Sequence, residues 1–323
     1  MLSRVAESIY WMSRYIERAE NVARVIDVNL NLMLDRPLGY EDQWDPLVNT
    51  TGDQENFSKN YGEATRENVI QFLTLDASNH NSILSCVRSA RENARSIREV
   101  ISSEMWEQVN RFYLMVNAEA AAGWSIEELH DFFGEIKLAS HLFAGITDST
   151  LSHNEAWNFC WLGRMLERAD KTTRILDVKY FILLPEVVAV GSPYDDIQWT
   201  SVLRSASALE MYRKSYGRLF PGSIVEFLLL DPQFPRAVHY CLNTADESLH
   251  AIAGSPLGSF KNLAEQRLGQ LRAELAYAQV SEIIHQGLHE FLDGLQYKLN
   301  FVGEGIHETF FAARPVSKLA LQK

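Results

Sequence analysis

One group of charged residues recurs at identical spacing in two places, and it carries the side chains best able to do chemistry. Residues 9–28 read IYWMSRYIERAENVARVIDV and residues 159–178 read FCWLGRMLERADKTTRILDV, an offset of 150 without a gap. Both follow the pattern W-x-x-R-x-x-E-R-A-x4-R-x-x-D-V. The arginines and glutamates shared by the two copies are Arg14, Glu17, Arg18, Arg24, Arg164, Glu167, Arg168 and Arg174, and the shared aspartates are Asp27 and Asp177. Guanidinium groups form forked contacts with carboxylates and phosphates.

Steps of three and four residues place each charged set on one face of a helix. In one interpretation the two helices pack together and the arginines of one pair with the glutamates of the other. Buried charges are tolerated when they are paired in this way. In the other interpretation the arginines face a cleft and bind a carboxylate or phosphate ligand. The sequence favours pairing, because a shared fold needs the same bonds in both copies.

A second basic stripe has no counterpart in the other half of the chain. Residues 88–98 read RSARENARSIR, so Arg88, Arg91, Arg95 and Arg98 fall on one helix face, with Glu92 beside them. The aligned positions near residue 250 are mostly neutral or acidic. Arginines on one face repel each other unless anions lie between them. Arg88, Arg91, Glu92 and Arg95 are therefore predicted to bind an anion or a partner; the alternative is pairing with acids of a neighbouring helix.

Short Glu-x-x-His motifs raise a different possibility, a metal site. The motif occurs four times, and Glu127/His130 with Glu282/His285 are the two pairs considered for a di-metal site. Facing helices of a bundle can assemble such pairs into di-iron carboxylate sites. The motif is short, however, and glutamate is common on exposed helix faces. We expect no metal and no cofactor, with the di-metal carboxylate enzyme as an alternative.

Composition limits the class of protein. The chain has 323 residues, of which 46% are apolar, and a net charge of −12. An acidic surface disfavours nucleic acid and anionic membranes. No stretch approaches the ~18 apolar residues of a membrane helix, and charges come too early for a signal peptide. Three widely spaced cysteines indicate neither a disulfide framework nor a zinc site, so a cytoplasmic location is expected.

The elements that position these residues are predicted to be helices. Residues 3–34 and 153–184 show apolar positions at helical spacing, and 72–76 (FLTLD) match 227–231 (FLLLD) at an offset of 155. The prediction is an all-α multi-helix bundle of two tandem pseudo-symmetric repeats, 1–150 and 151–311, with a flexible tail at 312–323. Linkers are expected at 35–62 and 185–195, and single helices at 79–103, 196–216 and 281–311. The oligomeric state stays open, a homodimer included.

Several long motifs resemble those of the bacterial alpha-E family. They are MLSRVAESIYWMSRYIERAENVARVIDVN, SILSCVRSARENARSIREVIS, EMWEQVN and WLGRMLERADKTTRILDVKY, in that order. The resemblance covers nearly the whole chain and implies an all-helical protein. It also implies an association with a circularly permuted ATP-grasp ligase, a transglutaminase-like protease and sometimes a proteasome-like peptidase. No catalytic residue comes with the resemblance.

Taken together, the sequence predicts a non-catalytic helical accessory subunit. It would bind an ATP-grasp amidoligase, or that enzyme's peptide substrate, in a system for peptide synthesis or peptide tagging. One alternative is the di-metal enzyme described above. Another is an enzyme that itself forms or cleaves amides, with Glu17 or Glu167 as a general base of raised pKa.

Overall fold

A computed structural model describes residues 1–34, 44–119, 126–183 and 193–312, and these residues form helices and no strands. The predicted all-α fold class is confirmed. The first half contains α1 (Ser3–Leu34), α2 (Asp45–Thr51), α3 (Gln54–Asn60), α4 (Arg66–Thr74), α5 (Ile83–Ser96), α6 (Ser103–Glu119) and α7 (Ile126–Thr150). The second half contains α8 (Glu155–Leu183), α9 (Pro193–Ser205), α10 (Leu209–Tyr216), α11 (Pro221–Leu230), α12 (Val238–Ala253), α13 (Leu263–Ala276), α14 (Val280–Gln286) and α15 (Leu288–Ile306), followed by a π-helical turn at His307–Phe311.

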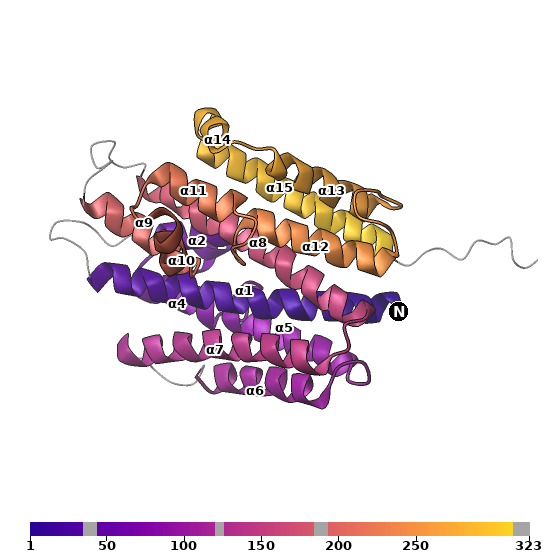
Figure 1. Cartoon of the computed structure of the whole chain (residues 1–323). Helices are drawn as coiled ribbons and strands as arrows, with labels where there is room; N and C mark the ends of the chain where they lie inside the picture. The colour runs from indigo at the N-terminus through magenta and orange to yellow at the C-terminus, as the bar shows by residue number, and fades with distance from the viewer. Residues whose placement is uncertain (35–43, 120–125, 184–192, 313–323) are drawn as a thin grey trace, which may run out of the picture.

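The two long helices α1 and α8 pack against each other at the centre of the molecule (Figure 1). Their apolar stripes are buried: Met12 and Ile26 of α1 and Leu162 and Leu176 of α8 are inaccessible to solvent. The helices approach each other closely at Gly163. A Cβ atom on that residue would lie 2.4 Å from the backbone oxygen of Tyr10, so only glycine permits this approach.

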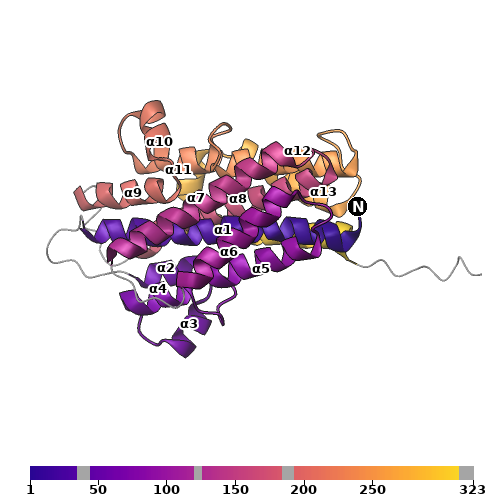
Figure 2. The same cartoon turned by 90° about the horizontal axis from the view of Figure 1, so that it is seen from below.

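Each central helix is covered by helices of its own half. α1 packs against α5 and α7, with α6 between those two, and α8 packs against α12 and α15, with α13 between those two. Figure 1 shows α5, α6 and α7 on one side of α1 and the orange-to-yellow helices on the other side, beyond α8. Two short elements cross over, because α2 packs against α8 and α9 packs against α1. The view from below shows α5, α6 and α7 lying over α1 (Figure 2).

Local sequence fixes several helix ends. The Ser82 hydroxyl accepts a hydrogen bond from the backbone N–H of Ser85 (3.1 Å), and Asn262 Oδ1 accepts one from that of Glu265 (3.0 Å). Such caps satisfy N–H groups that have no partner within the helix. Pro221 occupies the first turn of α11, and Gly254 ends α12 in the left-handed conformation that glycine adopts without strain.

The structure corrects four of the predicted boundaries. The expected linker 35–62 contains α2 and α3. The single helix expected over 196–216 is two helices, separated at Ser207, whose φ of 50° a right-handed helix cannot accommodate. Gly287, with φ of 109°, likewise divides the helix expected over 281–311. The helix expected over 79–103 ends as α5 at Ser96.

Three further predictions concern the C-terminal tail, the second linker and membrane-spanning helices. Most of the expected tail 312–323 and of the linker 185–195 lies outside the described residues. Among the helices of the described ranges, none is both long enough and apolar enough to cross a bilayer.

Candidate functional site

The duplicated charges meet at the contact between α1 and α8, where they form reciprocal ion pairs. Arg18 Nε donates to Glu167 Oε1 (2.7 Å) and Arg18 Nη2 donates to Glu167 Oε2 (3.0 Å). In the opposite direction, Arg168 Nε donates to Glu17 Oε1 (2.8 Å) and Arg168 Nη2 to Glu17 Oε2 (3.0 Å). The two Glu-Arg dipeptides therefore bind each other through two bidentate arginine–carboxylate pairs. Bidentate pairs are stronger than single hydrogen bonds, and they fix the relative orientation of the two side chains.

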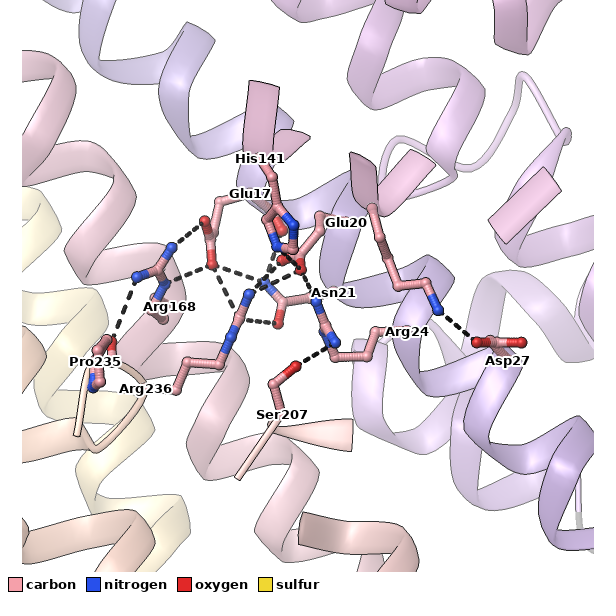
Figure 3. Close-up of polar contacts among 11 residues, drawn as sticks. Glu17, Glu20, Asn21, Arg24, Asp27, His141, Arg168, Ser207, Pro235 and Arg236 are labelled. Atoms are coloured by element: carbon pink, nitrogen blue, oxygen red, sulfur yellow. Dashed lines mark hydrogen bonds and ion pairs between the residues drawn. The ribbon is translucent and has the colours of Figure 1, made fainter. Parts of the chain in front are cut away.

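Glu17 lies in a larger cluster that includes a second acidic residue of the same helix, Glu20. Arg236, from the segment before α12, donates to Glu17 Oε1 (3.2 Å) and to both carboxylate oxygens of Glu20 (2.8 Å each). Arg24 donates to Glu20 and to the hydroxyl of Ser207. His141 of α7, which is 59% exposed, places Nε2 3.6 Å from Glu20 Oε1. Figure 3 shows these side chains converging between α1, α8 and the Pro235–Arg236 segment.

The Glu167 side of the contact holds a comparable cluster. Arg14 Nε donates to Glu167 Oε2 (2.8 Å), and Lys171 Nζ lies 3.6 Å from Glu167 Oε1. Asp170 accepts from Lys171 (3.1 Å) and from Arg174 (2.9 Å). A cavity of about 30 Å³ beside Arg18 and Lys171 has room for little more than water.

Electrostatics keep the central carboxylates ionised. Burial acts to raise the pKa of Glu167, but Arg18, Arg14 and Lys171 hold that pKa well below its usual value. For Glu17, burial is again opposed, here by Arg168 and Arg236, and the pKa is lowered. A general base works best with a pKa near the operating pH. The shift at Glu17 and Glu167 is opposite to the one that the amide-enzyme alternative requires.

Arg164 differs from the other arginines and glutamates shared by the two copies. It is only 5% exposed, yet within the described residues its guanidinium makes no hydrogen bond and no ion pair. Its contacts are with aromatic rings, Trp161 (5.2 Å to the centroid) and Phe143 (5.8 Å). Burial and the neighbouring Arg168 lower the pKa of Arg164, whereas Tyr10 and Glu167 raise the pKa of Arg14 despite its burial.

Two aspartate–histidine pairs attach outer helices to the central ones. His130 of α7 places Nδ1 2.6 Å from Asp27 Oδ1 of α1, and Lys137 donates to the other Asp27 oxygen (2.6 Å). His289 of α15 places Nδ1 2.8 Å from Asp177 Oδ1 of α8. Asp27 and Asp177 both end the repeated sequence motif. Their partners hold α7 on α1 and α15 on α8.

These contacts bear on the residues considered for a metal. His130 is engaged with Asp27, and Glu282 and His285 are exposed on the short helix α14. The side chain of Glu127 lies outside the described residues. Across the described part of the chain, no group of three His, Cys, Asp or Glu side chains is arranged to hold a metal ion.

The basic stripe lies on an open face formed by α5 and α6. Arg88 is exposed, and the Arg95 side chain is 64% exposed and pairs with Glu92 of its own helix (2.6 Å). Arg91 Nε donates to Asn110 Oδ1 of α6 (2.7 Å) and lies 5.0 Å from the ring centroid of Tyr113. The neighbouring helix thus contributes an amide and aromatic rings to the stripe.

The sequence did not predict three kinds of residue that pair with the duplicated charges at the contact between α1 and α8. Glu20 and Asp170 stand 150 residues apart and share an acidic character that the repeat comparison could have found. His130 and His289 are 159 residues apart, an offset that differs from the two recognised in the sequence. Arg236 had no such signal, because the aligned residue of the first half is Asn81, which instead accepts from Arg18 (2.8 Å).

Comparison with known proteins adds a family. An uncharacterised protein of Mycobacterium bovis is 23% identical over 94% of this chain, and one of Mycobacterium tuberculosis H37Rv is 22% identical over the same share. The chain spans about 35% of the length of these relatives. No solved structure matches. The model of the Alpha-E family, described as a predicted alpha-helical domain with a conserved ER motif, matches residues 1–311. Because that match spans both Glu-Arg dipeptides and nearly every helix, this chain belongs to the Alpha-E family.

Proposed function

We propose that this protein is a helical binding subunit whose α5–α6 face holds an acidic segment of a partner protein. The observation that carries the proposal is the contrast between two sets of arginines. Most of the central arginines are occupied by buried carboxylates. On the α5–α6 face, Arg88 and Arg95 extend into solvent, and Glu92 is the one acid in contact with the stripe among the described residues.

The surface beside these arginines suits a peptide chain. Arg98 lies 4.9 Å from the ring centroid of Trp106. A shallow hollow of about 560 Å³ on α6 is lined by Trp106, Asn110 and Leu114, the last of which is 54% exposed. Cationic groups around an apolar hollow favour a segment that carries both acidic and apolar side chains. In a chain of net charge −12, this local basic face gives a partner a defined orientation.

We propose further that the partner is an ATP-grasp amidoligase of a peptide-synthesis or peptide-tagging system, with a transglutaminase-like protein in the same system. The family resemblance supports this partner. The length of the mycobacterial relatives is consistent with it, since about two thirds of each lies beyond the span of this chain. The three buried free cysteines suit a reducing compartment such as the cytoplasm.

The two halves, 1–150 and 151–311, are proposed to be copies of one unit. Support comes from the sequence offsets, from the reciprocal Glu-Arg pairs and from the matched aspartate–histidine pairs. The basic stripe belongs to the first copy alone, so the proposed partner would meet one face of an otherwise repeated fold.

The test is a binding measurement between the full chain and a purified ATP-grasp ligase of the same genome. Arg88→Glu/Arg95→Glu should weaken binding roughly tenfold or more, chiefly through slower association, because exposed charges steer encounter. Arg213→Glu, a charge reversal at an exposed arginine of α10, is the matched control. Equal affinity of the double variant and the wild type would refute the proposed face, and no binding by the wild type would refute the proposed partner.

A further inference from the structure

Arg164 is a buried cation that has no hydrogen bond and no ion pair among the described residues, and Glu17 and Glu20 act on it only at longer range. Within the described residues its guanidinium has ring contacts alone, and its exposed fraction is 5%. Burying a charge is costly unless it is paired and hydrogen-bonded. The cation therefore calls for an acceptor that the described chain does not provide.

The equivalent residue in the other copy shows what is missing. Arg14 donates to Glu167 Oε2 (2.8 Å) and to the hydroxyl of Tyr10 (3.0 Å). The position 150 residues after Tyr10 is Cys160, whose thiol is a weak acceptor. The equivalent glutamate, Glu17, is already bound by Arg168 and Arg236. Two changes, the cysteine and the extra arginine, have thus removed both acceptors from Arg164.

The surrounding charges leave this corner positive. Four guanidinium groups, those of Arg24, Arg164, Arg168 and Arg236, lie about two carboxylates, Glu17 and Glu20. The four cations exceed the two carboxylates by two charges, and Arg164 is the one of the four that contacts neither carboxylate among the described residues. The field at this point attracts an anion.

A second unpaired donor lies on the same face of α8. Trp157, Trp161 and Arg164 follow at i, i+4 and i+7, and the two indole rings stack with centroids 5.1 Å apart. The indole N–H of Trp157 is buried and has no acceptor among the described residues. About 10 Å of helix axis separates the two donors, so the Trp157 N–H marks a second donor without an acceptor on this face and is not assigned to the group bound at Arg164.

We propose that Arg164, in contact with the rings of Trp161 and Phe143, is the binding residue of an oxyanion site that takes a carboxylate or phosphate group of a small ligand. The planar guanidinium fits either group through two parallel N–H···O contacts. Aromatic rings beside it keep its orientation. The site is separate from the α5–α6 face and does not depend on the partner proposed there.

The experiment follows the thermal unfolding midpoint of the full chain while chloride is replaced by inorganic phosphate or by acetate at constant ionic strength. The wild type should show a saturable rise of about 2 °C or more, as expected when a ligand binds the folded state alone. Arg164→Met should abolish the rise. Arg98→Met, which also removes an arginine from a tryptophan ring, should retain it, and so should Arg88→Glu/Arg95→Glu.

The two anions identify the ligand group. A response to phosphate alone assigns a phosphoryl group, a response to acetate alone assigns a carboxylate, and a response to both assigns a general oxyanion site. Should Arg164→Met fail to fold, Arg164→Lys replaces it; lysine keeps the charge but loses the fork, so at least about tenfold more anion should be needed. A wild type that responds to neither anion, or a response unchanged in the Arg164 variant, would overturn the site.

Discussion

Glu17 and Glu167 are the residues on which the charged centre depends. Each binds at least two guanidinium groups from the other half of the chain, and each is almost inaccessible to solvent. A buried ion pair adds little net stability compared with apolar residues of the same size. Removal of one partner is far more costly, because the charge that remains is buried and uncompensated.

Glu167→Gln should therefore destabilise the protein by about 3–5 kcal/mol, measured by urea unfolding at pH 7. The glutamine keeps the shape but leaves Arg14 and Arg18 without a counter-charge. The pH dependence gives a second signature. Because the folded-state pKa of Glu167 lies well below the usual 4.5, its contribution is complete above about pH 4.5 and is lost as the pH falls toward the folded-state value.

The variant should accordingly lose less stability than the wild type between pH 6 and pH 3, and the two curves should converge in acid. Glu107→Gln, at an exposed position of α6, serves as the control and should change stability by less than about 0.5 kcal/mol. Parallel wild-type and Glu167→Gln curves over this pH range would show that Glu167 is not the titrating group.

At the scale of helices, the close contact of α1 and α8 is what allows the ion pairs to form. The guanidinium groups can reach across because Gly163 lets the two backbones approach at Tyr10. The residue 150 positions before Gly163 is Ser13, also small and 1% exposed. Small residues at this level of both helices set the distance between their axes.

Gly163→Ala should destabilise the protein by about 1–3 kcal/mol, because the added methyl group overlaps the Tyr10 carbonyl and the backbones must move apart. Gly145→Ala is the matched control: Gly145 is also helical, and nothing lies within 4 Å of its added Cβ. That control should stabilise the protein by up to about 1 kcal/mol through helix propensity. If both variants gained stability, the contact between α1 and α8 would be looser than described.

The sequence predicts the helices well, but it predicts only some of the partners that the charged residues bind. The apolar periodicity of residues 3–34 predicts α1 because it reflects the helix itself. Ser207 and Gly287 break predicted helices through backbone conformations that composition does not reveal. Arg236 reaches Glu17 from 219 positions away, a contact that depends on how α11 and α12 turn. The unpaired state of Arg164 likewise follows from geometry, since its sequence motif equals that of Arg14.

For the molecule as a whole, a continuous apolar core isolates all three thiols. Cys86, Cys160 and Cys241 are at most 1% exposed, and burial raises the pKa of Cys86 and of Cys241 to about 12. The thiolate is the reactive form. Native protein at pH 8 should therefore react negligibly with Ellman's reagent over minutes, and denatured protein should release three equivalents. Rapid reaction of a native thiol would show that the core opens on that timescale.

The reciprocal pairing of the two Glu-Arg dipeptides has a consequence for the continuity of the chain. Contacts in which residue i of one element meets residue j of another, and j meets i in return, are those of an isologous interface between two subunits. Here both sides of the contact lie on one polypeptide, and the short connection between α7 and α8 joins them. Because Glu17 and Glu167 each receive their guanidinium groups from the other half, neither fragment of a chain cut at that connection would keep the arginine partners of its central glutamate. The connection acts as a tether that supplies each half with its obligatory partner at high effective concentration.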